Sequence, residues 1–220
     1  MPGVAHPEDA KVPAQIAADL KTLSRSWSVA VVTGRSVEDV RKKLDFTPDY
    51  LFGNHGAERA DQLAPHHLYQ KLNGCREFLS ASTALLAARK VRVEDKGLSL
   101  ALHYRQSENP VATRAWLREL VRSVSENMVV TDGHMVINMV LAHAPDKGDA
   151  VQTILQESGT EYALLVGDDE NDEAAFVNAP EHAVTVRIGP PAVCSRARFS
   201  LSGQHQVSAL LTLLVNQKGS

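Results

Sequence analysis

The sequence predicts an α/β fold in which helices and parallel strands alternate around a doubly wound sheet, with a smaller α+β unit inserted into it. Apolar runs at 29–32 and 162–166 are each followed by a glycine-containing polar loop and then a helical pattern. Between about residue 60 and residue 141 this alternation gives way to two hairpin-like strand pairs and two helices. We therefore expect a core of residues 1–59 and 142–220 and an inserted α+β domain of residues 60–141.

The first core segment begins with a polar, proline-bearing stretch and then alternates helix and strand. Pro13 opens a helical pattern, and Ser36 is placed to cap the next helix, with Glu38 completing a loose capping pattern. That helix carries an apolar stripe of Val37, Val40 and Leu44. The expected elements are a helix at 13–25, a strand at 29–32, a helix after Ser36 and a short strand at 50–52.

The remaining elements follow from apolar periodicity and turn signals. In the inserted unit we expect helices at 72–88 and 110–124, and strands at 91–94, 98–104, 128–131 and 135–141. The core then resumes with a helix at 147–156, a strand at 162–166, a helix after Asn171, a strand at 184–188 and a closing helix at 207–214.

Composition and charge exclude several classes of function. With 44% hydrophobic and 22% charged residues the chain is typical of a globular protein, and a net charge of -3 without a Lys/Arg run argues against nucleic acid or an acidic membrane as partner. We see no apolar stretch of transmembrane length and no signal peptide, and therefore expect a cytoplasmic protein. Cys75 and Cys194 lack metal or redox spacing and are interpreted as free thiols.

A burst of carboxylates follows one apolar run. The segment YALLVGDDENDEAAF, residues 162–176, combines a strand expected to be buried on both faces with Gly167, which permits a sharp turn. Asp168, Asp169 and Asp172 are then presented together at the end of the strand, where α/β sheets place their ligands. Such a cluster suits Mg²⁺. The alternative is that these acids merely cap a helix, since the helix dipole favours acids there.

Two further loops supply groups that a phosphoryl site needs. Thr33 and Gly34 follow the strand at 29–32, and Lys147 starts a helix. A hydroxyl, a backbone amide and an ammonium bind phosphate oxygens, while a metal neutralises the charge that develops during transfer. Alone, the tripeptide TGR is usually a turn and such a lysine is usually solvated. Their order in the chain and their placement after separate strands favour one shared phosphate site over these separate interpretations.

Five segments, taken in order, resemble one known family. VAVVTGRSVEDV, LFGNHGAE, VEDKGLSLALHYR, DKGDAV and LLVGDDENDEAAF resemble the trehalose 6-phosphate phosphatases of the haloacid dehalogenase superfamily. The resemblance covers nearly the whole chain and implies a Rossmann-like core with an inserted cap. It implies that Thr33 and Lys147 are catalytic phosphate-binding residues. It also implies that Mg²⁺ is held by Asp168, with Asp169 and Asp172 in support.

The same resemblance exposes a gap. In the family an aspartate attacks the phosphate and a second aspartate two positions later acts as acid and base, both within a DxDGT motif on the first core strand. The 220 residues contain no DxD pair, and Asp132 with Gly133 falls at a turn of the inserted unit. Because VAHPEDAKVP resembles the stretch just after DxDGT, we expect a truncated or wrongly started chain, with an in-frame DxDGT upstream of Met1. Loss of a central strand predicts exposed apolar edges.

The resemblance also indicates residues that bind substrate. It assigns Glu94 and Lys96 of the inserted cap to the disaccharide, and His103, Tyr104 and Arg105 fit the same setting. In VINMVLAH, Asn138 is the nearest polar equivalent of a glutamate and an arginine that the family usually carries, so substrate identity is less secure than reaction class. The core residues expected to bind substrate are Gly34, Arg35, Asn54, His55 and Glu58.

Three functions remain open from the sequence. The first is a Mg²⁺-dependent phosphatase that releases phosphate and trehalose from trehalose 6-phosphate, lacking its nucleophile in this chain. The second is a non-catalytic module that binds sugar phosphates or regulates, and the third is a related sugar phosphatase with another substrate. Closure of the cap over the core is expected to exclude water. Oligomeric state is left open.

Overall fold

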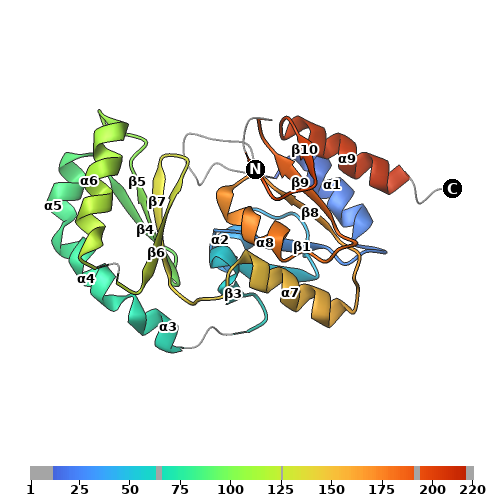
Figure 1. The fold of residues 1–220 in the computed structure, drawn as a ribbon, viewed down its shortest axis with the longest axis horizontal. Helices are drawn as coiled ribbons and strands as arrows, with labels where there is room; N and C mark the ends of the chain where they lie inside the picture. Colours follow the sequence, from blue (N-terminus) through green and yellow to red (C-terminus); the bar gives the residue numbers. More distant parts are fainter. Residues whose placement is uncertain (1–11, 63–65, 125, 191–193, 217–220) are drawn as a thin grey trace. The chain divides into compact units, whose positions relative to one another are not determined.

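The computed structural model describes residues 12–62, 66–124, 126–190 and 194–216, and most of the VAHPEDAKVP segment, residues 4–13, lies outside them. The chain separates into two compact units (Figure 1). Unit 1 combines residues 1–60 with 145–220, and unit 2 is the continuous segment 61–144. The sequence-based boundaries differ from these by one to three residues. The role of unit 2 as a cap stays a prediction.

Unit 1 is built from alternating helices and strands from both ends of the chain. Its first segment contains α1 (Ala14–Leu23), β1 (Ala30–Val32), α2 (Val37–Arg41), β2 (Tyr50–Gly53), the 3-10 turn η2 (Asn54–Gly56) and β3 (Glu58–Arg59). Its second segment contains α7 (Lys147–Ser158), β8 (Leu164–Gly167), η3 (Glu170–Asp172), α8 (Glu173–Val177), β9 (Val184–Ile188), β10 (Phe199–Leu201) and α9 (His205–Asn216). A mixed α/β fold is therefore confirmed.

The strands of unit 1 form two three-stranded sheets, ordered β1-β2-β3 and β10-β9-β8. β1 runs parallel to β2 with Val31 opposite Leu51, and β8 runs parallel to β9 with Val166 opposite Val186. Within the described ranges, β1 pairs only with β2 and β8 only with β9. Each of these strands is therefore the edge of a parallel sheet, a position that parallel strands rarely occupy without cover.

The edge positions explain a wrong prediction from the sequence. The strand at 162–166 was expected to be buried on both faces, but Val166 leaves 38% of its surface exposed. In the other run, at 29–32, Ala30 is exposed as well. Periodicity identified the strands correctly, because β-branched and aliphatic residues suit parallel sheets. Periodicity does not report whether a neighbouring strand is present on each side.

Helices hold the two halves of unit 1 together. α1 and α9 lie side by side (Figure 1). Leu23 of α1, Val29 just before β1 and Leu211 of α9 form a buried cluster. Thr212 of α9 also donates a 3.2 Å hydrogen bond to the buried carboxylate of Asp19 on α1. The first and last helices of the chain are thus packed through both apolar and polar contacts.

Unit 2 is a four-stranded antiparallel sheet with helices on one face (Figure 1). The strands are ordered β4-β5-β7-β6. Their side chains on the helix-covered face, including Leu100, Leu102 and Met139, are almost fully buried against Leu117 and Val121. The elements are α3 (His66–Lys71), α4 (Asn73–Ala81), α5 (Thr83–Ala88), β4 (Arg92–Asp95), β5 (Ser99–His103), α6 (Pro110–Arg122), β6 (Met128–Gly133) and β7 (Val136–Leu141).

Two predicted helices are corrected. The single helix expected at 72–88 is broken at Ser82, a buried residue with φ -89° and ψ 5° between α4 and α5. The helix after Ser36 ends at Arg41, so the stripe residue Leu44 packs from outside it. Its cap is the Ser36 side chain, which accepts from the Asp39 amide.

Other departures from the expected elements are small. Glu38 takes no part in that cap and instead pairs with Lys42 at 2.6 Å. The short strands β3 and β10 had no signal in the sequence. Both cysteines are free thiols, as expected. In the described ranges, no helix is both long and apolar enough to cross a membrane.

Gly56 allows a close approach that positions the site. It has φ +110°, and a Cβ built on it would lie 2.1 Å from the backbone oxygen of Asp146, the residue before α7. Both the backbone conformation and the contact exclude a side chain. The turn after β2 and the start of α7 therefore touch through backbone atoms.

Substitution of Gly56 tests this contact. We expect Gly56→Ala to lower the free energy of unfolding of unit 1 by about 3 kcal/mol or more, because a backbone clash is added to left-handed strain. Gly159→Ala is the matched control: Gly159 has φ +65°, and a Cβ placed there would meet nothing within 4 Å, so only the strain of about 1 kcal/mol remains. Urea unfolding followed by Trp27 fluorescence in a Trp116→Phe background measures both. Equal losses would contradict the argument.

Candidate active site

The loop after β1 is held by its own hydroxyl and by the neighbouring strand. The Thr33 amide donates to the Phe52 carbonyl at 2.9 Å, which continues the β1–β2 ladder by one residue. The Thr33 hydroxyl oxygen accepts from the Arg35 amide at 3.2 Å. The Arg35 guanidinium extends along α2 and pairs with Asp39 at 2.5 Å. The hydroxyl proton of Thr33 remains able to donate to an anion.

The turn after β2 supports this loop from the side. The His55 amide donates to the Thr33 carbonyl at 2.9 Å, and the His55 ring lies so close to Gly34 that a Cβ there would be 2.5 Å from it. Buried Asn54 donates from its side chain to Glu58 at 2.7 Å. The same Glu58 oxygen also accepts from the Val37 amide at the start of α2, at 2.9 Å. Asn54 and Glu58 thus fix the loop, whatever they contribute to substrate binding.

The start of α7 delivers a buried ammonium. Asp146 caps the helix, with its side chain accepting from the amides of Gly148 and Asp149 at 2.7 and 3.0 Å. Lys147 is the first residue of the helix and only 8% exposed. Its Nζ lies 2.5 Å from Asp172 Oδ1, the one hydrogen-bond partner it has among the described residues. Two of its three protons can therefore serve a bound anion.

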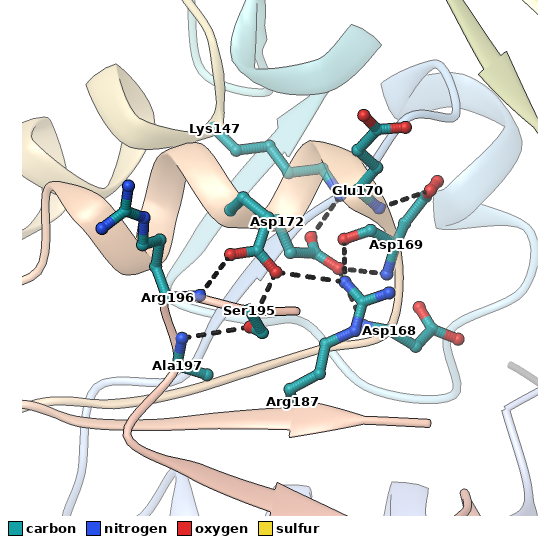
Figure 2. Close-up of polar contacts among 10 residues, drawn as sticks. Lys147, Asp168, Asp169, Glu170, Asp172, Arg187, Ser195, Arg196 and Ala197 are labelled. Atoms are coloured by element: carbon teal, nitrogen blue, oxygen red, sulfur yellow. Dashed lines mark hydrogen bonds and ion pairs between the residues drawn. The ribbon is translucent and has the colours of Figure 1, made fainter. Parts of the chain in front are cut away.

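The Asp172 side chain links α7 to the loop of residues 168–172, which we call the acidic loop (Figure 2). One carboxylate oxygen binds Lys147, and the other accepts from the amides of Asp168 and Asp169 at 2.8 and 2.9 Å. The side chain lies against Gly167, where a Cβ would come within 2.4 Å of it. Gly167 is thus required for this contact as well as for the turn.

Asp168 and Asp169 differ in their surroundings. The Asp169 side chain accepts from the Glu170 amide at 2.7 Å and caps the η3 turn. Asp168 is exposed, and Figure 2 shows its carboxylate pointing away from the contacts around Asp172. Its Oδ2 accepts from Gln204 at 3.0 Å, while its Oδ1 has no hydrogen bond within the described ranges. Asp168 is therefore the most exposed of the three predicted acids, Asp168, Asp169 and Asp172, and the most accessible of them to a cation.

A second network, of hydrogen bonds around Arg187 and Glu173, also holds the acidic loop. Arg187, near the end of β9, donates to the carbonyl of Asp169 (Figure 2). Its Nη1 also lies 3.5 Å from Glu173 Oε1. Glu173 in turn accepts from the Ser195 hydroxyl and from the Arg196 amide, each at 2.7 Å. No sequence pattern pointed to Arg187, Glu173 or Gly56, because their roles depend on contacts between segments distant in sequence.

The structure brings the three predicted loops of unit 1 together. Contacts run from Thr33 to His55, from Gly56 to Asp146, and from Lys147 to Asp172. The site therefore presents a hydroxyl, backbone amides, a buried ammonium and an exposed carboxylate. No group of three Asp, Glu, His or Cys side chains in the described parts of the chain converges as a metal-binding cluster.

The residues predicted in unit 2 lie on its sheet or in the turn that follows β4. Glu94 is on β4 and hydrogen-bonds with His103 of β5 at 2.6 Å. Lys96 is in the turn that follows, where its amide donates to the Ser99 carbonyl at 3.0 Å. The same turn contains Gly97, with φ +85°. Glu94 and Lys96 thus lie at one end of the β4–β5 hairpin.

Comparisons with known proteins find relatives of similar sequence and structures of similar fold. A probable trehalose-phosphate phosphatase of Sinorhizobium fredii is 29% identical over 218 residues, covering 94% of this chain and 81% of that protein. The trehalose-6-phosphate phosphatase of Escherichia coli is 26% identical over 216 residues, covering 95% and 80%. The C-terminal domain of the C. albicans trehalose-6-phosphate phosphatase superposes with a TM-score of 0.85 at 18% identity, covering 98% of this chain and 88% of that one.

This superposition places the chain in the class of α/β proteins that share the fold of that solved domain. Within that class the match is specific, because the sequence pattern of trehalose-phosphatase matches residues 1–217. The chain belongs to the trehalose-phosphatase family and is by family a phosphoric monoester hydrolase.

The Lys147–Asp172 pair can be tested by a double-mutant cycle. Lys147→Met and Asp172→Asn should each destabilise unit 1, because either change leaves a buried polar partner unpaired. We expect a coupling energy of about 1–3 kcal/mol between them. Equilibrium urea unfolding of the four proteins measures it. As a control, the exposed pair Lys42 and Glu38 should show coupling below about 0.5 kcal/mol. Additive effects at Lys147 and Asp172 would contradict the arrangement.

Proposed function

We propose that this chain forms the phosphate-binding core and sugar-binding unit of a trehalose 6-phosphate phosphatase. The observation that carries the proposal is the buried Lys147 ammonium, held by Asp172 and linked through the Gly56 turn to the Thr33 loop. A buried cation with protons to spare next to a hydroxyl is suited to a phosphate group. The free thiols Cys75 and Cys194 support placing this activity in the cytoplasm.

The proposed roles follow from the contacts of each group. The Thr33 hydroxyl and the Gly34 amide bind phosphate oxygens from one side. The Arg35 amide, which donates to the Thr33 hydroxyl oxygen, holds that hydroxyl in place. Lys147 binds them from the other side and opposes the charge that develops as the phosphoester bond breaks. Asp172 positions Lys147, and its two backbone contacts hold the loop that carries Asp168.

The donor set near Asp168 fits Mg²⁺. Its oxygens are hard ligands, and Mg²⁺ is usually held by one or two carboxylates with water and substrate phosphate completing the shell. Asp168 would bind the ion directly, while Asp169 and Asp172, whose oxygens accept backbone hydrogen bonds, would support the loop. When bound, the ion would supply positive charge to the phosphate.

The nucleophile is the part that these residues do not contain. The resemblance requires an aspartate pair spaced DxD, and the sequence has none. The open edges of β1 and β8 support the proposal that the active form has a further parallel strand there, carrying that pair. Such a strand would bring its carboxyl end to the loops that hold Thr33 and Asp168.

Unit 2 is proposed to bind the disaccharide and to act as the cap. Glu94 and Lys96 offer an acceptor and a donor for sugar hydroxyls, which leave costly unpaired groups when buried without partners. His55, Asn54 and Glu58 are proposed to line the phosphate side of the substrate. A related sugar phosphate is the alternative substrate, to be discriminated with a panel of phosphorylated sugars.

A non-catalytic role is the second candidate, and the missing DxD pair favours it. A module of this kind would keep Thr33, Lys147 and the acidic loop for binding only. Calorimetry discriminates the two: binding of trehalose 6-phosphate without phosphate release, even after extension of the chain, would establish the binding module. Absence of binding would count against it.

The catalytic proposal predicts the effect of extending the chain. The 220-residue protein should release no phosphate from trehalose 6-phosphate, whereas a protein extended by the codons upstream of Met1 should do so with Mg²⁺. In the extended protein, Thr33→Val should lower kcat by about 10²-fold, and Thr33→Ser should retain most activity. A phosphate-release assay measures these rates. An upstream frame without DxDGT, together with an inactive extended protein, would overturn the proposal.

The metal proposal can be tested in the 220-residue chain alone. We expect Mn²⁺, used as a probe for Mg²⁺, to bind and to change water-proton relaxation. Asp168→Asn should weaken this binding by about tenfold or more, because it removes the direct carboxylate. Asp45→Asn, at another exposed carboxylate of unit 1, is the control and should leave it unchanged. Equal binding by both variants would exclude Asp168 as the ligand.

A further inference from the structure

One histidine of unit 2 lies on the face of the sheet that the helices do not cover. Leu100 and Leu102 of β5 point into the helix-covered core, so Ser99, Ala101 and His103 lie on the opposite face. Glu94 of β4 is opposite Ala101 in the antiparallel register and therefore shares that face. His103 is the next residue of β5 on the same face, and its Nε2 lies 2.6 Å from Glu94 Oε2.

When Glu94 is ionised, only His103 can be the donor of this hydrogen bond. A carboxylate can only accept, so His103 donates its Nε2 proton to it. This hydrogen bond is the main cause that lowers the pKa of Glu94 to about 2, with the charges of Lys96 and Arg92 acting in the same direction and burial opposing them. The neighbouring β7 and β6 residues in this row, Asn138 and Thr131, are uncharged. Glu94 is thus held as an anion at physiological pH.

The pair leaves hydrogen-bonding capacity unused. The side chains of Glu94 and His103 are only 28% and 21% exposed, yet the second oxygen of Glu94 has no hydrogen bond within the described ranges. On β7, opposite Ala101, the side-chain amide of Asn138 is likewise without a hydrogen bond there, at 6% exposure. Polar groups this little exposed are normally paired. Ala101, which lies between them, is itself fully buried.

We propose that His103 is a positioning residue that fixes the Glu94 carboxylate so that its second oxygen accepts hydrogen bonds from hydroxyls of the sugar. This inference rests on the proposed function, because Glu94 binds substrate only if unit 2 binds the sugar. Without His103, Glu94 would remain charged at neutral pH but would sample several rotamers. That rotamer freedom would then be lost on binding, which lowers affinity.

The first experiment measures the contact itself. In the full 220-residue chain, the Glu94 carboxyl is followed by ¹³C NMR through a pH titration. Its pKa should rise from about 2 toward the ordinary value of 4.5 in His103→Phe, and should stay low in His103→Gln, which keeps a donor. His134→Gln, at the exposed β6–β7 turn, is the matched control. An unchanged Glu94 pKa in His103→Phe would overturn the inference.

The second experiment measures the consequence with trehalose as the probe. Calorimetry at pH 7 should show about tenfold weaker binding by His103→Phe, binding by His103→Gln within about threefold of wild type, and unchanged binding by His134→Gln. If His103→Phe binds trehalose as tightly as the wild type does, the positioning role is overturned. No trehalose binding by the wild type, with the expected change in Glu94 pKa, would instead overturn the proposed sugar site.

Discussion

The carboxylate of Asp172 is the interaction on which the site of unit 1 depends. It joins two elements that lie 25 residues apart, because one oxygen binds Lys147 of α7 and the other binds two amides of the loop after β8. A charged pair with so little exposure is stable only when its remaining hydrogen-bonding capacity is also satisfied. The two backbone donors on Asp172 meet that condition on the acidic side, while Lys147 keeps protons for a ligand.

A second constraint comes from the arrangement of the strands. β1 and β8 carry apolar residues suited to a covered parallel sheet, yet among the described residues each has a partner on one side only. The helices compensate: α1 packs on α9, and the start of α7 touches both the Gly56 turn and the acidic loop. Unit 1 is thereby held together through its helices and loops.

The two units present different kinds of polar group. Unit 1 presents an ammonium, amides and a hydroxyl, which suit phosphate oxygens. Unit 2 presents an ionised carboxylate held by a histidine, and a buried side-chain amide, on one face of its sheet, and such groups suit sugar hydroxyls. A phosphorylated disaccharide carries both kinds of group, so the separate properties of the units agree with membership of the trehalose-phosphatase family.

Local sequence alone predicted many of the secondary-structure elements and several of the candidate site residues. Thr33, Lys147 and Asp168 could be found because each follows a recognisable apolar run or opens a helix, and β9 was predicted with its observed bounds because its periodicity is local. Tertiary structure alone decided that β1 and β8 are edges and that Asp172 serves Lys147. It also decided that His103 pairs with Glu94, and that Gly56 and Arg187 matter. Those properties arise from contacts between segments distant in the chain, and no pattern within either segment specifies its partner.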